Sequence, residues 1–383
     1  MASNSGNHVV PEDVTVEILS RLPVKSLMRF GGVCRYWYTI IRNSSFITKH
    51  HDHHNNNVHL LVQYYNFDTE KFAFSLFPDE NLDSVPLLYH ELDELQMSRD
   101  PLYVLGPVNG ILCLFNGGDH VALWNPTLRD FRLLPKLQEN SPPYFTINWD
   151  SFAFGLDPLT KNYKVVWIRY FWDDRIDTLY FPPIVAVYTL WTNSWKMIEI
   201  DLPLNQPIDS TFNDGFINGT YYWMTSDNSD MYMIISFEMG NETFGMIRLP
   251  LDFPKLPWEG LTVYNDSLIV ILYHPPMEEK YFEIWRMEKE GLWNKQLTIG
   301  PFLDIDRPLG LWKNGELFLE SEKTQQLLLY NINTQETKVL GPRGYEHCLK
   351  VLNYKQSLVS LKGQNEFREV YNSSNMIREF CTS

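Results

Sequence analysis

The stretch "VALWNPTLRDFRLLP" (121–135) consists of two apolar runs separated by a short polar turn, a pattern that predicts a β-hairpin. The same order recurs in residues 60–78, 185–203, 233–250 and 327–342, and more loosely in 282–301. The turns lie near residues 68, 126, 192, 240, 290 and 333, a period of roughly 50 residues. Repetition on this scale predicts one four-stranded unit per repeat.

A second kind of hairpin alternates with the first. Residues 107–115, 216–224, 263–272 and 312–320 each carry an Asn-Gly or Asn-Asp turn before a buried-looking run, and 152–168 and 351–363 are looser versions. Asn-Gly favours the positive φ angles of a tight hairpin. Two hairpins per repeat predict a six-bladed β-propeller closed by strands from both termini. The irregular spacing leaves a two-sheet β sandwich as the alternative.

The N-terminal stretch "PEDVTVEILSRLPVKSLMRFGGVCRYWYTII" (11–41) predicts two or three short helices. Pro11 suits a helix start, Val14, Ile18 and Leu22 form an apolar stripe, and Pro23 ends the first helix. This segment has more apolar residues than so small a unit can bury within itself. Either the helices pack onto the large domain, or they dock a separate helical protein.

The core "EILSRLPVKSLMRF" followed by "VCRYW" resembles the F-box motif, which implies binding to the Skp-type adaptor of a cullin ubiquitin ligase. Val10 stands where the family usually has Leu. The pair Gly31-Gly32 costs helix roughly 1 kcal/mol per glycine, which predicts weaker adaptor binding or an end to the second helix. The adaptor-facing residues that the resemblance implies are Pro11, Ile18, Leu19, Leu22, Pro23, Leu27, Val33, Cys34 and Trp37.

The large region resembles the F-box-associated domain of plant F-box proteins, through "LWNPTLRDFRLLP", "FGLDPLTKNYKVVWI" and "YTLWTNSWKMIEI". It is most similar to the S-locus F-box group, whose members act in pollen and bind S-locus ribonucleases in self-incompatibility. The resemblance implies a mainly β protein with a small all-α F-box and a kelch-like propeller. It further implies a substrate-recognition subunit of an SCF-type ubiquitin ligase that binds a basic client. An unrelated client, a non-degradative client-binding module and a carbohydrate-binding or enzymatic propeller are the alternatives.

The expected organisation follows from these stretches. We expect a disordered N-terminus over 1–8, F-box helices over 9–48, a linker over 49–57, the propeller domain over 58–370 and a tail over 371–383. The linker is rich in histidine and asparagine, but it lacks a nearby cysteine and a fixed geometry, so we favour a solvated linker over a metal site.

Charge is unevenly distributed along the chain, whose net charge is −15. Residues 1–49 carry six basic against three acidic side chains, so residues 50–383 carry −18. An acidic body disfavours nucleic acid and favours a basic protein partner. The segment "RYFWDDRIDTLYFPP" (169–183) mixes aromatic and acidic residues as protein-binding surfaces often do. Its predicted client-binding residues are Phe171, Trp172, Asp173, Asp174 and Asp177.

The remaining patterns favour a non-catalytic protein without cofactor or metal. The sequence has no GxSxG, GxGxxG, P-loop, HExxH or CxxC motif. Its four cysteines are far apart, and no stretch has the length of a signal peptide core or a membrane span. We therefore expect a cytoplasmic location, with the nucleus as a second one.

Overall fold

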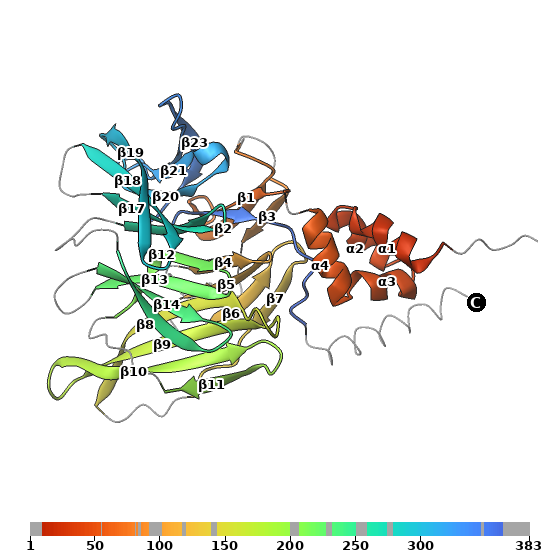
Figure 1. The fold of residues 1–383 in the computed structure, drawn as a ribbon, viewed down its shortest axis with the longest axis horizontal. Coiled ribbons are helices and arrows are strands. Elements are labelled where there is room, and N and C mark those ends of the chain that lie inside the picture. Colours follow the sequence, from red (N-terminus) through yellow and green to blue (C-terminus); the bar gives the residue numbers. More distant parts are fainter. Residues whose placement is uncertain are drawn as a thin grey trace, which may run out of the picture.

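The computed structural model describes residues 10–54, 56–80, 82, 86–91, 102–116, 120–138, 144–199, 207–226, 232–249, 259–273, 279–345 and 348–362. These residues form a small helical module and six four-stranded antiparallel sheets arranged as the blades of a propeller (Figure 1). The predicted six-bladed propeller is confirmed, and the alternative of a two-sheet sandwich is wrong. None of the helices in the described part of the chain has the length and apolar character that crossing a membrane requires.

Five blades follow the order of the chain, with the first strand innermost and the fourth outermost. The second blade contains β4 (Tyr103–Val108), β5 (Ile111–Phe115), β6 (Val121–Asn125) and β7 (Asp130–Leu133). The third contains β8 (Phe145–Leu156), β9 (Tyr163–Asp173), β10 (Thr178–Thr189) and β11 (Ser194–Ile198). The fourth contains β12 (Asp209–Ile217), β13 (Thr220–Ser226), β14 (Tyr232–Glu238) and β15 (Thr243–Arg248). The fifth contains β16 (Glu259–Tyr264), β17 (Ser267–Tyr273), β18 (Lys280–Lys289) and β19 (Leu292–Phe302). The sixth contains β20 (Arg307–Leu311), the short 3-10 helix η1 (Lys313–Gly315), β21 (Leu317–Glu320), β22 (Gln326–Tyr330) and β23 (Thr337–Arg343).

The first blade closes the ring with strands from both ends of the propeller region. It contains β1 (His59–Asn66), β2 (Lys71–Phe77), β3 (Leu88–Glu91) and β24 (Lys350–Tyr354), in the order β24-β1-β2-β3. The innermost strand β24 pairs antiparallel with β1, with Leu352 opposite Leu61. Closure by strands from both termini is therefore confirmed, and it leaves the ring without an unpaired gap between blades.

Two hairpin assignments differ from expectation because of this closure. Residues 60–78 form the middle pair of their blade, β1 and β2, and not an outer hairpin like the other copies of the repeat. Residues 351–363 contribute only β24, and the chain continues as a strandless strap, residues 355–362. The first blade takes its innermost strand, β24, from the C-terminal side of the chain. The hairpin patterns of residues 60–78 and 351–363 are therefore each displaced by one strand relative to the other blades.

The Asn-Gly turns join the innermost strand of a blade to the next one. Asn109 and Gly110 have φ angles of 47° and 75°, and Asn218 and Gly219 have 51° and 83°. A β-carbon at position 110 would lie 2.5 Å from the carbonyl oxygen of Lys355, so the strap also requires glycine there. The predicted tight hairpins are confirmed at these two turns.

Tryptophan side chains join neighbouring blades, as their places in the strand runs suggest. Trp223 is fully buried, and its Nε1 donates to the carbonyl of Phe152 in the preceding blade at 2.8 Å. Trp195 donates to the carbonyl of Pro135 at 2.6 Å, and Trp293 donates to that of Arg248 at 2.9 Å. Trp195 and Trp293 are half-buried, and each of the three indoles pairs its single donor across a blade boundary.

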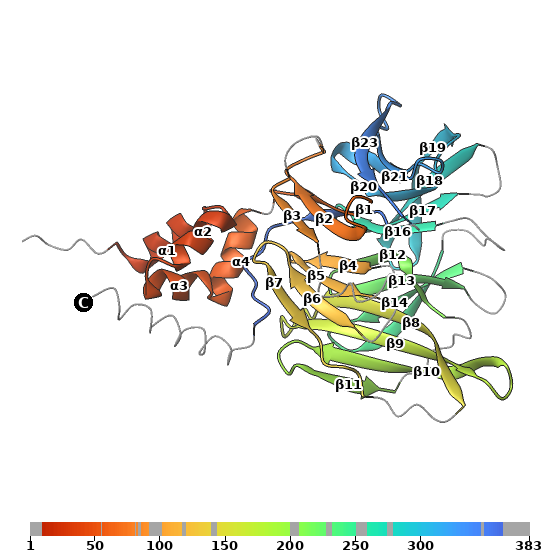
Figure 2. The same ribbon diagram turned by 180° about the vertical axis from the view of Figure 1, so that it is seen from behind.

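The helical module consists of α1 (Glu12–Ser20), α2 (Val24–Gly31), α3 (Arg35–Ile41) and α4 (Ser44–His53), and it lies at one side of the propeller (Figures 1 and 2). Helix α2 ends at Gly31, so the glycine pair terminates the second helix. The expectation of a linker over 49–57 is wrong at its start, because α4 continues to His53. Asn43 caps this helix by accepting a hydrogen bond from the Ser45 backbone. The expected segments 1–8 and 371–383 lie outside the described residues.

Ring closure generates a truncation prediction. A chain ending at Leu349 lacks β24 and the strap, which leaves the first blade open beside the channel; we expect aggregation or a non-cooperative thermal transition. A chain ending at Lys362 keeps both elements and should melt at the midpoint of the full chain. Circular dichroism melting curves of both chains test this, and equal midpoints for the two truncations would contradict the role given to β24.

Candidate functional site

The helical module has a small core of its own. Leu19, Leu27 and Phe46 are buried there together with Val24, Ile40 and Ile41. Two of the nine residues predicted to face an adaptor, Leu19 and Leu27, thus belong to this core. Leu22 and Trp37 are half-buried and pack against it, and Cys34 is also half-buried. Leu19, Leu27, Leu22 and Trp37 thus contribute to the folding of the module, and their apolar pattern does not by itself mark a surface.

The other four predicted adaptor-facing residues are exposed. Ile18 is 55% exposed and Val33 is 61% exposed, and Pro11 and Pro23 are also on the surface. The structure adds further exposed apolar residues that the sequence prediction did not include, namely Val10, Val14, Met28 and Tyr36. Val14 could have been found from the sequence, because it lies four residues before Ile18 on α1. We call the set Val14, Ile18, Met28, Val33 and Tyr36 the apolar surface of the module; uncovered apolar residues in this number are typical of a protein-binding site.

The C-terminal strap attaches the helical module to the propeller. Leu358 of the strap and Leu128 from the turn between β6 and β7 join the core of the module. Asn125 is fully buried, and its side-chain amide donates to the carbonyls of Ser357 (3.2 Å) and Val359 (2.7 Å). In Figures 1 and 2 the strap runs from β24 past α4. The module is therefore packed against the ring and not merely linked to it.

Histidines of the predicted linker lie at this junction. His50 is buried, and its Nε2 lies 3.0 Å from the carbonyl oxygen of Leu22, while the centre of its ring lies 4.4 Å from that of His54, with the rings tilted by 34°. Burial lowers the pKa of His50 to about 4, so the ring is neutral near pH 7 and Nε2 donates to Leu22. Within the described ranges no group of three or more His, Cys, Asp or Glu side chains is arranged to hold a metal ion.

Strand alternation divides the connections of the ring between two faces. In an antiparallel four-stranded blade, the first and third turns lie on one face, and the second turn and the connection to the next blade lie on the other. Leu128, in a third turn, contacts the helical module, so that face is the helix-side face. The turn 174–177 between β9 and β10 is a second turn and lies on the opposite side, the far face (Figure 1).

The predicted client-binding residues are distributed between the interior and the surface of this hairpin. Phe171 is 2% exposed and belongs to the interior. Asp173 is 3% exposed, and both its carboxylate oxygens accept from Arg175, at 2.9 and 2.7 Å. This ion pair lowers the pKa of Asp173. The carboxylate that the sequence predicts to bind a client is therefore already paired within the hairpin. Asp174 and Asp177 are exposed, and Trp172 is half-buried with its Nε1 donating to Asp177 at 3.2 Å.

Acidic residues from other parts of the chain also lie on far-face connections where the structure describes them. Glu91 ends β3, Glu279 precedes β18, and Asp304 and Asp306 connect β19 to β20. The carboxylate of Asp304 already has partners within the propeller, since it accepts hydrogen bonds from Ser321 and from the Lys323 backbone. Asp93, Glu94, Asp227, Asp230 and Glu278 lie outside the described residues.

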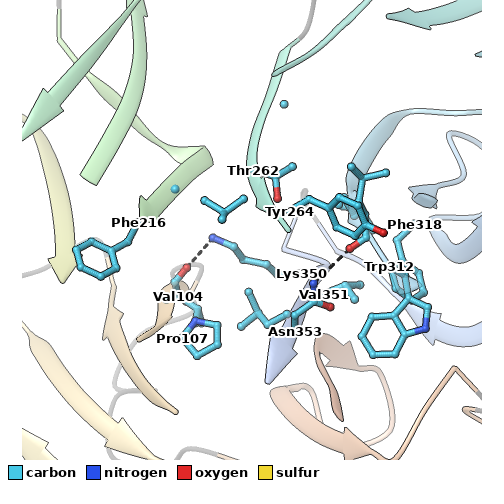
Figure 3. Close-up of a pocket in the computed structure, with 18 of the residues that line it drawn as sticks. Val104, Pro107, Phe216, Thr262, Tyr264, Trp312, Phe318, Lys350, Val351 and Asn353 are labelled. Atoms are coloured by element: carbon cyan, nitrogen blue, oxygen red, sulfur yellow. Dashed lines mark hydrogen bonds between the residues drawn. The ribbon is translucent and has the colours of Figure 1, made fainter. Parts of the chain in front are cut away.

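A cavity of about 990 Å³ occupies the channel between the innermost strands. Figure 3 shows Phe216, Tyr264 and Trp312 around it, with Lys350 extending to the carbonyl of Val104. Asn353 donates to the carbonyl of Leu311 at 3.3 Å, which joins β24 to β20 along the wall. The channel thus combines aromatic and polar side chains in a concave site of a size that holds small molecules.

Known protein families match both the helical module and the propeller. The F-box-like family matches residues 8–52, and the F-box associated beta propeller domain family matches residues 58–358. The chain belongs to the F-box-associated β-propeller family. This F-box protein is 26% identical over 365 residues to an F-box/kelch-repeat protein of Arabidopsis thaliana, covering 92% of this chain and 96% of that protein. An F-box protein of the same plant is 28% identical over 309 residues, covering 78% and 74%. The crystal structure of TolB from Acinetobacter baumannii has 12% identity and a TM-score of 0.44, covering 76% of this chain and 65% of that one.

The buried histidine of the F-box generates a pH prediction. Between pH 6.5 and about 4 the unfolded chain binds a proton at position 50 that the folded chain does not, so stability falls as pH falls through this window. His50→Gln keeps a donor for Leu22 without this titration, and we expect a smaller loss of urea midpoint between pH 7.5 and 5. The exposed His53→Gln is the control and should follow the wild type. An equal loss in all three proteins would contradict the assignment.

Proposed function

We propose that this F-box protein is the substrate-recognition subunit of an SCF-type ubiquitin ligase. The observation that carries the proposal is the opposition of two surfaces: the apolar surface of the F-box on one side of the chain, and the acidic far face of the propeller on the other. One surface suits a helical adaptor of the Skp type, and the other suits a client. The strap and the shared core hold the two surfaces in one arrangement.

The contribution of such a subunit to catalysis is proximity. A client held on the far face has its lysines presented to the ubiquitin-loaded enzyme that the cullin carries, which converts an encounter in solution into a reaction within one complex. No bond chemistry is assigned to the chain itself, in keeping with a receptor and not an enzyme.

The charge of the propeller supports a basic client. Residues 50–383 carry −18, and exposed acids at 174 and 177 lie beside a half-buried tryptophan on the far face. Opposite charge accelerates association and discriminates against acidic partners. An S-locus ribonuclease in pollen is the narrower hypothesis, which rests on the resemblance of the sequence and on this charge. A receptor for an unrelated client and a module that binds a client without degradation remain the alternatives.

The apolar surface of the F-box provides the first test. Ile18→Ser with Val33→Ser removes two exposed apolar contacts, and we expect adaptor affinity to fall at least about tenfold. Both positions are on the surface, so the urea midpoint should stay near that of the wild type. The matched control Met246→Ser with Val339→Ser changes two equally exposed apolar residues on the propeller. A receptor then loses client ubiquitination and keeps client binding, whereas a non-degradative module binds its client in both forms and supports no client ubiquitination in either.

The far face provides the second test. Asp174→Lys with Asp177→Asn raises the net charge by three and keeps an acceptor for Trp172, and we expect slower client association, most strongly at low salt. Glu290→Lys with Glu336→Gln makes the same charge change on the helix-side face and should leave association unchanged. Proteins that co-purify under proteasome inhibition are identified by mass spectrometry, and purified clients are then measured by surface plasmon resonance. Equal rates for both variants would remove the hairpin from the client site.

A further inference from the structure

The central channel has a charge opposite to that of the protein around it. Among the lining side chains that the structure describes, the charged ones include Lys313, Lys350 and Lys355 against one carboxylate, Asp266. Arg307 also lines the cavity, but its Nε lies 2.8 Å from the buried carboxylate of Glu320. In this described part of the lining, lysines therefore outnumber carboxylates, in a chain whose net charge is −15. A narrow site with one sign of charge and low-dielectric walls concentrates ions of the other sign.

The fold brings two of these lysines to the same mouth. The innermost strands all run in the same direction, so the ends of β20 and β24 meet at the helix-side face. Lys313 lies two residues after the end of β20, and Lys355 directly follows β24. The hydrogen bond from Asn353 to the carbonyl of Leu311 holds these two strands side by side. The Lys313 Nζ lies 4.7 Å from the centre of the Trp312 ring, which orients this ammonium at the mouth.

The third lysine lies within the channel. Lys350 begins β24, and its Nζ donates to the carbonyl of Val104 in the second blade at 2.6 Å. In Figure 3 its side chain extends through the open space between the inner strands. An ammonium has three donors, so this geometry positions a cation inside the cavity while it holds two blades together.

Two histidines near the mouth respond to the same positive potential. The pKa of His51 is lowered by burial and then by the charge of Lys355. The pKa of His59 is lowered by burial and also by the charge of Lys313, against the opposing effect of hydrogen bonds to its ring. Two histidines from different elements thus lie close enough to a lysine of the mouth for its charge to act on them.

We propose that the central channel binds a small phosphorylated polyanion, which enters at the mouth formed by Lys313 and Lys355 and reaches toward Lys350. The cavity of about 990 Å³ suits a small molecule and is too narrow for a folded protein. Phosphate is favoured over carboxylate because a phosphate group carries nearly two negative charges near pH 7 and three acceptor oxygens, whereas a carboxylate carries one charge and two oxygens. Lysine ammonium groups bind phosphate as point charges.

Such a site is independent of the adaptor and client surfaces. Its mouth lies beside α4, since His51 and Asn56 also line the cavity. A bound anion would contact both the ring and the segment that joins it to the F-box. Binding to the folded state alone raises stability in proportion to the logarithm of ligand concentration, so occupancy is measurable without any assay of ligase activity.

Titration calorimetry on the full chain tests the proposal, with sodium tripolyphosphate as the probe and with citrate and sulfate at matched ionic strength. We expect saturable binding of tripolyphosphate, weaker binding of the other two anions, and at least a tenfold loss of affinity in Lys313→Met with Lys355→Met. Lys323→Met with Lys338→Met removes the same charge from exposed positions outside the channel and should bind as the wild type does. Non-saturating heats, or equal affinity in both double variants, would overturn the proposal, and tighter binding of citrate would overturn the phosphate assignment.

Lysine labelling provides a readout that needs no variant. Acetylation by an N-hydroxysuccinimide ester is followed for each lysine by peptide mass spectrometry, with and without tripolyphosphate. We expect slower modification of Lys313 and Lys355 when the anion is present and an unchanged rate at Lys338. Equal protection at all three lysines would show a general ionic effect and would contradict a site in the channel.

Discussion

The pairing of β24 with β1 is the constraint on which the rest of the structure depends. Both strands lie in the first blade, and their register places Leu352 opposite Leu61, although the two residues are separated by nearly the whole propeller. Forming this pair closes a loop that contains the other five blades, and the contacts within those blades offset the entropic cost of closing so long a loop. The closed ring then has no unpaired sheet edge at the seam, and the innermost strands enclose the channel.

The same constraint determines which parts of the chain are on which face. A blade with four antiparallel strands returns the chain to the face from which it started, so every blade repeats the same division of turns. The F-box lies against the third turn of the second blade and the strap, and this leaves the second turns, including 174–177, on the opposite side. The alternating direction of the strands therefore separates the surface proposed for the adaptor from the surface proposed for the client, without a dedicated spacer. Acidic residues at connections far apart in the sequence meet on one face for the same reason.

Much of this architecture could be predicted from the sequence, because a hairpin depends on residues that are close together in the chain: two apolar runs and the turn between them. Asn109-Gly110 and Asn218-Gly219 need positive φ angles, and the structure has them. The offset in the first blade could not be read locally, since β1 looks the same whether its inner neighbour comes before or after it. The sequence also could not show which side chains of a segment point inward and which point to solvent. Phe171 and Asp173 fall in an aromatic and acidic segment, but alternation along β9 directs both inward, and Arg175 takes the carboxylate. Leu19 and Leu27 show the same limit in the F-box, where one apolar pattern contains both core and surface positions.

Ring closure and F-box attachment are two consequences of a single segment. Directly after β24 the chain crosses the second blade, where Asn125 and Asp130 fix its backbone, the latter by accepting from the Leu361 amide at 2.8 Å. Leu358 lies between the two residues whose carbonyls Asn125 binds, and it enters the core of the F-box. Loss of the contacts of the strap would therefore weaken both the inner wall of the channel and the attachment of the F-box to the propeller. The position of the F-box relative to the far face is thus determined by the packing that completes the propeller, and the two modules form one structural unit.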